Sequence, residues 1–158
     1  MTTTPHPVQH GAFTLERLYD APPALVFRAW SDPTAKRQWF HGPSGWTHME
    51  HALDFRVGGS EINRGRSADG ELHAYDARYE DIVHDARIIL AFSMTVGPVR
   101  ISSSLLTVTF SPEGPQRTRL LLTEQIAVLD PRFPIDGREQ GTRELLDNLH
   151  AHLMKAPR

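Results

Sequence analysis

Residues 87–129, RIILAFSMTVGPVRISSSLLTVTFSPEGPQRTRLLLTEQIAVL, alternate apolar and polar side chains with a period of two. Two interruptions, Gly97-Pro98 and Pro112-Glu113-Gly114, divide this stretch into three segments. Both interruptions have the composition of tight turns, and connections this short join antiparallel neighbours, because a parallel crossover needs about a dozen residues or more. The stretch therefore predicts three consecutive antiparallel strands.

The same period of two continues toward the N-terminus and predicts a longer antiparallel meander. Gly58-Gly59, Asp69-Gly70 and His84-Asp85 supply turns of the same kind. We expect about seven strands in all, at residues 13–19, 46–57, 60–67, 72–84, 87–95, 100–111 and 117–129.

Helical signals occur in two places. Asp20 is expected to cap a helix over residues 23–30, and Ser31-Asp32-Pro33 is expected to open a second short helix ending near Trp39. Asp136 is expected to cap a final helix over 137–155, whose apolar stripe is Leu145, Leu146, Leu149 and Leu153. The order predicts an α+β fold in which a curved sheet wraps the long C-terminal helix and leaves an apolar pocket between them.

Composition narrows the class of protein. The chain has 158 residues and no cysteine, so disulfides are excluded. Its formal net charge is -2, so it has no excess of basic residues with which to neutralise the phosphates of a nucleic acid. No apolar stretch approaches the roughly 20 residues of a membrane span. We expect a flexible tail over 1–10, a single domain over 11–156, and a cytoplasmic location without nucleic-acid partners.

Several motifs resemble those of one known family. They are DAPPALVFRAWSDP at 20–33, KRQWF at 36–40, DFRVGG at 54–59, YEDIV at 79–83, RIIL at 87–90 and EQGTRELLDNL at 139–149. Together they resemble the activator of heat-shock-protein-90 ATPase homologue-like family, within the START-like superfamily of polyketide cyclases and lipid-transport proteins. Val57 stands where that family usually has proline, and Thr142 where tryptophan is common. The resemblance spans about residues 13–154 and implies the seven-stranded helix-grip fold.

Glu124 is the strongest candidate for a ligand-binding or catalytic residue. It shares a strand face with four apolar residues, Leu120, Leu122, Ile126 and Val128. A carboxylate on such a face is either paired or shifted in pKa, and could orient a ligand or transfer a proton. The alternatives are a salt bridge, with Arg143 as the expected partner, or an exposed position at a strand end.

A pocket in such a fold would be lined mainly by aromatic and aliphatic side chains. Gly141 lies on the inward face of the final helix, where a glycine indicates either close approach by the sheet or room for a ligand. Simple core packing is the alternative for each member of the expected lining, which is Trp39, Tyr75, Tyr79, Phe92, Met94, Leu122, Glu124, Phe133, Gly141 and Leu145.

The nine histidines do not form a metal motif. His48 and His51 are expected on opposite strand faces, and His150 and His152 on different helix faces. No His-Glu-x-x-His spacing occurs. We therefore expect no metal and no cofactor.

Three functions follow from the pattern and the resemblance. The preferred one is binding of a small hydrophobic molecule, such as a lipid, polyketide or aromatic metabolite, in the pocket. The second is a polyketide cyclase- or dehydratase-like enzyme using Glu124 as the acid–base group. The third, implied by the family name alone, is a co-chaperone-like activator of a heat-shock-protein ATPase. An exposed edge strand could also support a homodimer.

Overall fold

Within the part of the chain that the structure describes, seven antiparallel strands form one sheet in the order β1-β7-β6-β5-β4-β3-β2. The computed structural model describes residues 5–155, so residues 1–4 of the expected tail and residue 156 of the expected domain lie outside it. The strands are β1 (Gln9–Tyr19), β2 (Thr47–Leu53), β3 (Ser60–Arg66), β4 (Leu72–Val83), β5 (Arg87–Val96), β6 (Val99–Pro112) and β7 (Thr118–Val128).

The two outermost strands differ most from their predicted bounds. β1 begins at Gln9, where it pairs with Val128, so two residues expected in the tail belong to the sheet. β2 ends at Leu53, because the backbone turns sharply after Asp54. At Gly59 in this turn, a Cβ atom would collide with the carbonyl oxygen of Asp54, so the turn requires glycine there.

Among residues 5–155, three helices accompany the sheet: α1 (Pro23–Ser31), α2 (Pro33–Arg37) and α3 (Ile135–Lys155). Asp32 caps α2 as predicted, accepting a bond from the Ala35 amide at 3.0 Å. The other two predicted caps are wrong. Pro22 occupies the cap position of α1, and Asp20 pairs instead with the Arg117 guanidinium at 3.0 Å. α3 begins at Ile135, so Asp136 lies in its first turn.

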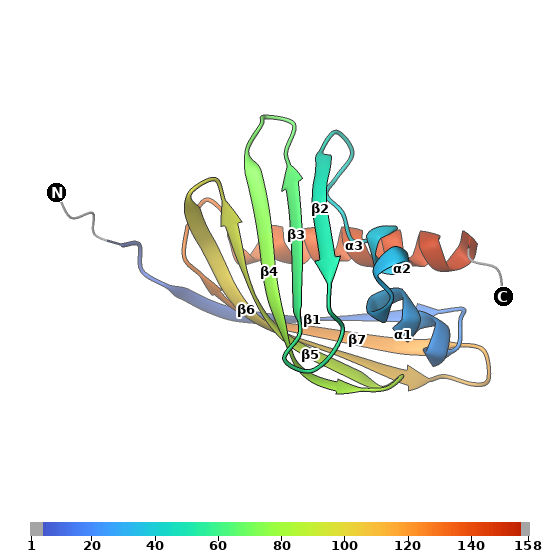
Figure 1. The fold of residues 1–158 in the computed structure, drawn as a ribbon. Coiled ribbons are helices and arrows are strands. Elements are labelled where there is room, and N and C mark those ends of the chain that lie inside the picture. Colours follow the sequence, from blue (N-terminus) through green and yellow to red (C-terminus); the bar gives the residue numbers. More distant parts are fainter. Residues whose placement is uncertain (1–4, 156–158) are drawn as a thin grey trace.

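The core lies between α3 and the concave face of the sheet. Residues of even number on β7 point inward, and α3 buries Leu146, Leu149 and Leu153. Tyr19 fastens β1 to the helix by donating its hydroxyl to the Leu146 carbonyl at 3.0 Å. Figure 1 shows the strands turning from upright β2–β4 to nearly horizontal β1 and β7, with α1 and α2 toward one end. This is the predicted helix-grip fold.

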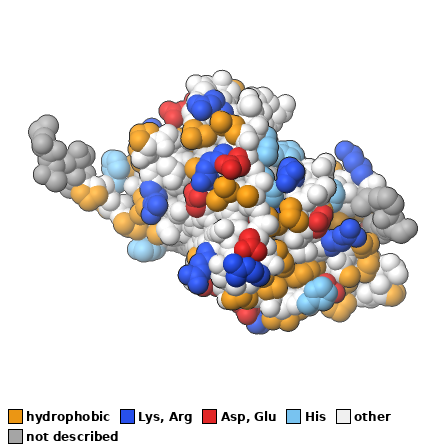
Figure 2. All heavy atoms as spheres, in the orientation of Figure 1, with side chains coloured by type: hydrophobic (Ala, Val, Ile, Leu, Met, Phe, Trp, Pro, Cys, Tyr) orange, Lys and Arg blue, Asp and Glu red, His pale blue; other side chains and the backbone are white. Residues whose placement is uncertain are grey.

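Positive and negative side chains are interspersed on the face seen in Figure 2, rather than gathered into a field of one sign. Within residues 5–155, no helix combines the length and apolarity needed to cross a bilayer.

Candidate functional site

Glu124 lies on the inner face of β7 and is 2% exposed. Its Oε2 accepts bonds from Arg138 Nη1 and Ser104 Oγ, both at 2.7 Å. Arg138 also donates from Nη2 to Ser102 Oγ at 2.6 Å, so the pair ties α3 to β6 and β7. The predicted partner was wrong: the exposed side chain of Arg143 pairs with Glu139 at 2.8 Å. A carboxylate fixed in this way is an oriented acceptor, and no donor among residues 5–155 bonds to its Oε1.

Aromatic rings continue the site from the Arg138 guanidinium toward β2. The guanidinium lies 5.7 Å from the ring centre of Phe92, and the ring of Phe92 lies 4.9 Å from that of Tyr75. Phe40, just after α2, packs its ring edge-on against Tyr75 at 5.0 Å. Burial raises the pKa of the Tyr75 phenol well above its usual value, and the Glu61 and Glu124 carboxylates add to the shift. This phenol is therefore a neutral hydrogen-bonding group at neutral pH.

Gly141 leaves a position on α3 unfilled by any side chain. It follows Arg138 by three residues and precedes Leu145 by four, so all three lie on one stripe of α3. Arg138 reaches the sheet, and the half-buried Leu145 packs against the core. A Cβ at Gly141 would nevertheless meet no heavy atom within 4 Å. Of the two explanations offered for this glycine, the structure therefore favours room along the stripe, because the sheet does not approach the helix closely at this position.

A second buried carboxylate, Glu61 on β3, lies nearer α2. Its Oε1 accepts bonds from Lys36 Nζ at 2.6 Å and Tyr79 Oη at 2.8 Å, and its Oε2 lies 2.7 Å from His51 Nε2. Lys36 is 1% exposed and Glu61 is fully buried. Burial alone would raise the pKa of Glu61, but the Lys36 ammonium and the hydrogen bonds from His51, Lys36 and Tyr79 lower it. The carboxylate is thus ionised and saturated by its partners.

A bulge in β2 changes the expected placement of two histidines. The pairing with β3 shifts register between His48 and Glu50, so His48 pairs with Gly65 and His51 with Asn63. Positions 63 and 65 have the same parity on β3, which places His48 and His51 on the same side of the sheet. The prediction of opposite faces was wrong, because it assumed an unbroken strand.

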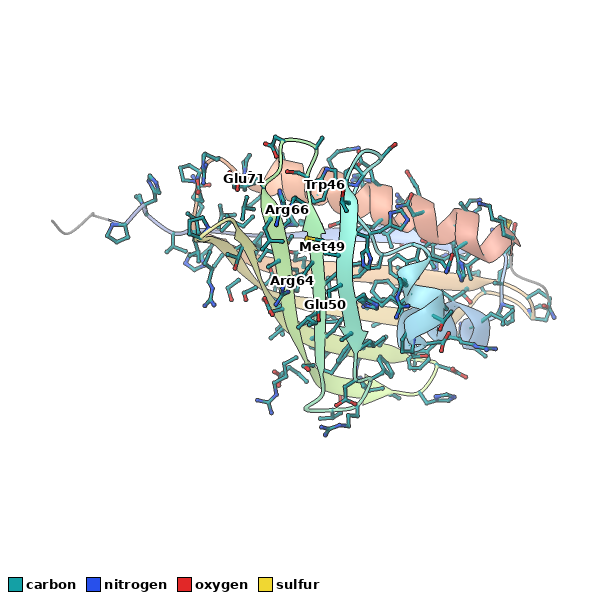
Figure 3. The ribbon with its side chains drawn as sticks, turned by 45° about the horizontal axis from the view of Figure 1, so that its top comes forward. Trp46, Met49, Glu50, Arg64, Arg66 and Glu71 are labelled. Carbon is teal, nitrogen blue, oxygen red and sulfur yellow. The ribbon has the colours of Figure 1, made fainter. Side chains whose placement is uncertain are left out.

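Trp46 precedes β2 and covers the end of the inner face. Its ring lies 4.3 Å from that of His73, and a Cβ at Gly65 would touch it at 3.6 Å. Figure 3 shows Trp46 at the upper end of β2, with Met49 and Glu50 farther along that strand and Arg66 on β3. The aromatic cover therefore extends to the tip of the sheet.

The predicted lining divides into core and site. Trp39, Tyr79 and Leu122 are fully buried in packed surroundings, where Trp39 donates its indole N–H to the Ala29 carbonyl at 2.9 Å. Phe133 is half-buried in the loop before α3, below the guanidinium of Arg132. The other members are linked through Arg138, which contacts Glu124 and Phe92. Tyr75 lies against Phe92 and pairs with Met94, while Gly141 and Leu145 follow Arg138 along α3.

Two hollows in the surface of residues 5–155 lie outside this region. One is an open depression of about 700 Å³ across β1, β7 and β6, whose lining includes Ala12, Ser103, Gln125 and Ala127. The other, about 90 Å³, lies beside the N-terminal segment at Gln9 and Pro131. Neither hollow is the enclosed apolar pocket predicted between the sheet and the helix.

Sequence reasoning missed four charged or polar members: Lys36, His51, Glu61 and Arg138. Lys36 precedes Trp39 and Phe40 by three and four residues, so its helical spacing placed it with the apolar side of the short helix. Arg138 lies one turn before Gly141 on the inward stripe, and that spacing could have identified it. Glu61 gives no such signal, because the apolar neighbour Ile62 points to the opposite face of β3 and is only half-buried.

Comparisons with known proteins agree with this architecture. The sequence model of the family described as "Activator of Hsp90 ATPase homolog 1-like protein" matches residues 20–154. A solved Rhizobium leguminosarum protein, called uncharacterized, is 48% identical with a TM-score of 0.89, over 95% of this chain and 98% of that one. A Rhizobium loti protein is 42% identical with a TM-score of 0.85, over 93% and 99% of the two chains.

A more distant solved structure, from Chromobacterium violaceum, is 26% identical with a TM-score of 0.74, over 92% of this chain and 98% of that one. No curated protein matches the sequence. The similarity therefore identifies a family and a fold, and the chemistry of the site has to be argued from its own residues.

Proposed function

The chain belongs to the Activator of Hsp90 ATPase homolog 1-like protein family, and from that premise we propose that it binds a small, mainly hydrophobic molecule in the groove between α3 and the concave face of the sheet. The observation that carries the proposal is the open space at Gly141, on a helix stripe whose neighbours on both sides contact the core.

The chemistry around the groove supports a ligand with an apolar body. Phe92 and Tyr75 offer ring faces, and the half-buried Met94 and Leu145 offer flexible aliphatic contacts. Ligand sites are mostly apolar, with a few fixed polar groups that set orientation. Glu124 fits that role, because Arg138 and Ser104 hold one oxygen in place while Oε1 is left to accept a donor.

This geometry favours positioning over acid–base catalysis for Glu124. A general acid must carry a transferable proton, whereas this carboxylate accepts bonds from a guanidinium and a hydroxyl. The cyclase-like alternative therefore needs another proton donor. The co-chaperone alternative gains no specific support from a contact among residues 5–155, so binding is the function that the geometry supports best.

Blocking the groove tests the proposal. Gly141→Leu would fill the open space, whereas Gly137→Leu would place the same side chain on an exposed part of the same helix. With naphthol as a fluorescent aromatic probe, we expect Gly141→Leu to weaken binding by about tenfold or more, equal to about 1.4 kcal/mol. Gly137→Leu should bind like the wild type. Equal affinity of both variants and the wild type, or no binding by the wild type, would contradict the proposed site.

A further inference from the structure

One polar atom of the buried Glu61 cluster has no partner within the structure. The side chain of His51 is 0% exposed, and its Nε2 is held by Glu61 at 2.7 Å. Among residues 5–155, nothing forms a hydrogen bond with its buried Nδ1. A buried, unpaired polar atom costs about 1–3 kcal/mol, so its retention calls for a physical reason.

The neighbours of His51 define which hydrogen-bonding role Nδ1 can take. The Glu61 carboxylate is ionised and only accepts bonds, so Nε2 of His51 must carry the proton that lies between them. In a neutral imidazole, the other nitrogen then presents a lone pair. A second proton on Nδ1 would bury an unpaired N–H donor beside Lys36, which already supplies the positive charge that balances Glu61.

The sheet places His51 in register with residues of the proposed groove. Strand register places His51, Asn63, Tyr75 and Met94 in one row across β2, β3, β4 and β5. Neighbouring strands lie about 4.8 Å apart, so the backbones at His51 and Tyr75 are separated by about 10 Å. That span is close to the length of a two-ring aromatic molecule with one polar substituent.

Phe40 lies between the row and α2. Its ring is 5.0 Å from Tyr75 and 6.3 Å from His51, and its side chain is half-buried. The segment that follows it, residues 41–45, is rich in glycine and proline and is mostly exposed. Because this ring lies against both Tyr75 and His51, a ligand that spans the row has to move it, and side-chain rotamer changes are common when partners bind.

We propose that His51 is a specificity-determining residue, whose Nδ1 accepts a hydrogen bond from a hydroxyl or N–H group at one end of an aromatic ligand. The inference rests on the proposed function, to which it adds the chemical group that the ligand must carry. Lys36 and Glu61 do not contact the ligand in this proposal. They position His51 and fix the tautomer that makes its Nδ1 an acceptor.

The test compares naphthol with its methyl ether, which has the same rings but no donor. Wild type should bind naphthol about tenfold more tightly, because only naphthol satisfies the buried acceptor. His51→Phe should remove that preference while leaving the affinity for the ether nearly unchanged. His48→Phe, an exposed substitution on the same strand, should keep the preference.

A second measurement requires no substitution. Nitrogen NMR of the wild-type imidazole should show the His51 Nδ1 resonance move upfield with naphthol but not with the ether, while Nε2 keeps its proton. If both compounds bind equally, Gly141→Leu weakens both, and the Nδ1 resonance does not move, the groove stands and the role of His51 is overturned. If neither compound binds, the proposed function and this inference both fail.

Discussion

The two buried carboxylates of the concave face are held in different ways. Glu61 has both oxygens engaged, by Lys36, Tyr79 and His51, in a cluster closed to solvent. Glu124 uses one oxygen for both of its partners, and the side chain of Arg138 is 14% exposed. The difference indicates that the Glu61 cluster mainly locks β2 and β3 to α2, whereas Glu124 keeps one oxygen free, as the proposed ligand site requires.

The largest expected effect on stability comes from breaking the buried ion pair of the Glu61 cluster. Lys36→Met leaves the Glu61 charge buried without its cation, so the free energy of unfolding should fall by about 3–5 kcal/mol. Urea denaturation measures the loss. The double variant Lys36→Met with Glu61→Leu removes both charges and should recover most of it. A double variant no more stable than Lys36→Met would show that the ion pair is not the source of the effect.

Acidification should reproduce part of that loss. The pKa of Glu61 is lowered from 4.5 in the folded chain, so its stabilising effect is complete above that value and is lost as the pH falls through the folded-state pKa. The stability difference between wild type and Glu61→Gln should therefore narrow between pH about 7 and pH about 4 or below. Urea midpoints at several pH values measure it, and a constant difference would contradict the ionised state of Glu61.

A smaller loss of stability is expected when the Glu124–Arg138 pair is broken. Arg138→Met removes one bond to Glu124 and one to Ser102, but Ser104 still bonds to the carboxylate, and Arg138 is 14% exposed where Lys36 is 1% exposed. The expected loss is about 1–3 kcal/mol, measured by the same denaturation. A loss as large as that of Lys36→Met would remove the distinction between the two clusters.

The smallest expected effect is a gain in stability from filling the position of Gly141. Gly141→Ala should raise the free energy of unfolding by about 0.5–1 kcal/mol, because alanine favours the helix and the new methyl group meets no atom. Thermal or urea unfolding measures this gain. Gly59→Ala provides the contrast, since its Cβ would collide with backbone, and it should be destabilising. If Gly141→Ala were destabilising, the space beside Gly141 would have to be filled by other atoms, which would contradict the proposed groove.

The sequence was enough for the sheet, because short turns and a period of two leave few alternatives to a meander. It also pointed to Glu124, since an acid on an otherwise apolar strand face is conspicuous. The partner could not be predicted, because the choice between Arg138 and Arg143 depends on how α3 is rotated against the sheet. Glu61 was hidden because polar residues occupy the inner face of β3, and the bulge near Met49 left no signal in the alternation.

The groove is tested most directly by NMR of the wild-type protein titrated with naphthol. We predict that the amide of Gly141 and the methyl groups of Met94 and Leu145 shift as naphthol saturates, while the Gly137 amide stays fixed. Shifts confined instead to the outer depression, at Ala12, Ser103 and Ala127, would contradict the account and place binding on the opposite face of the sheet.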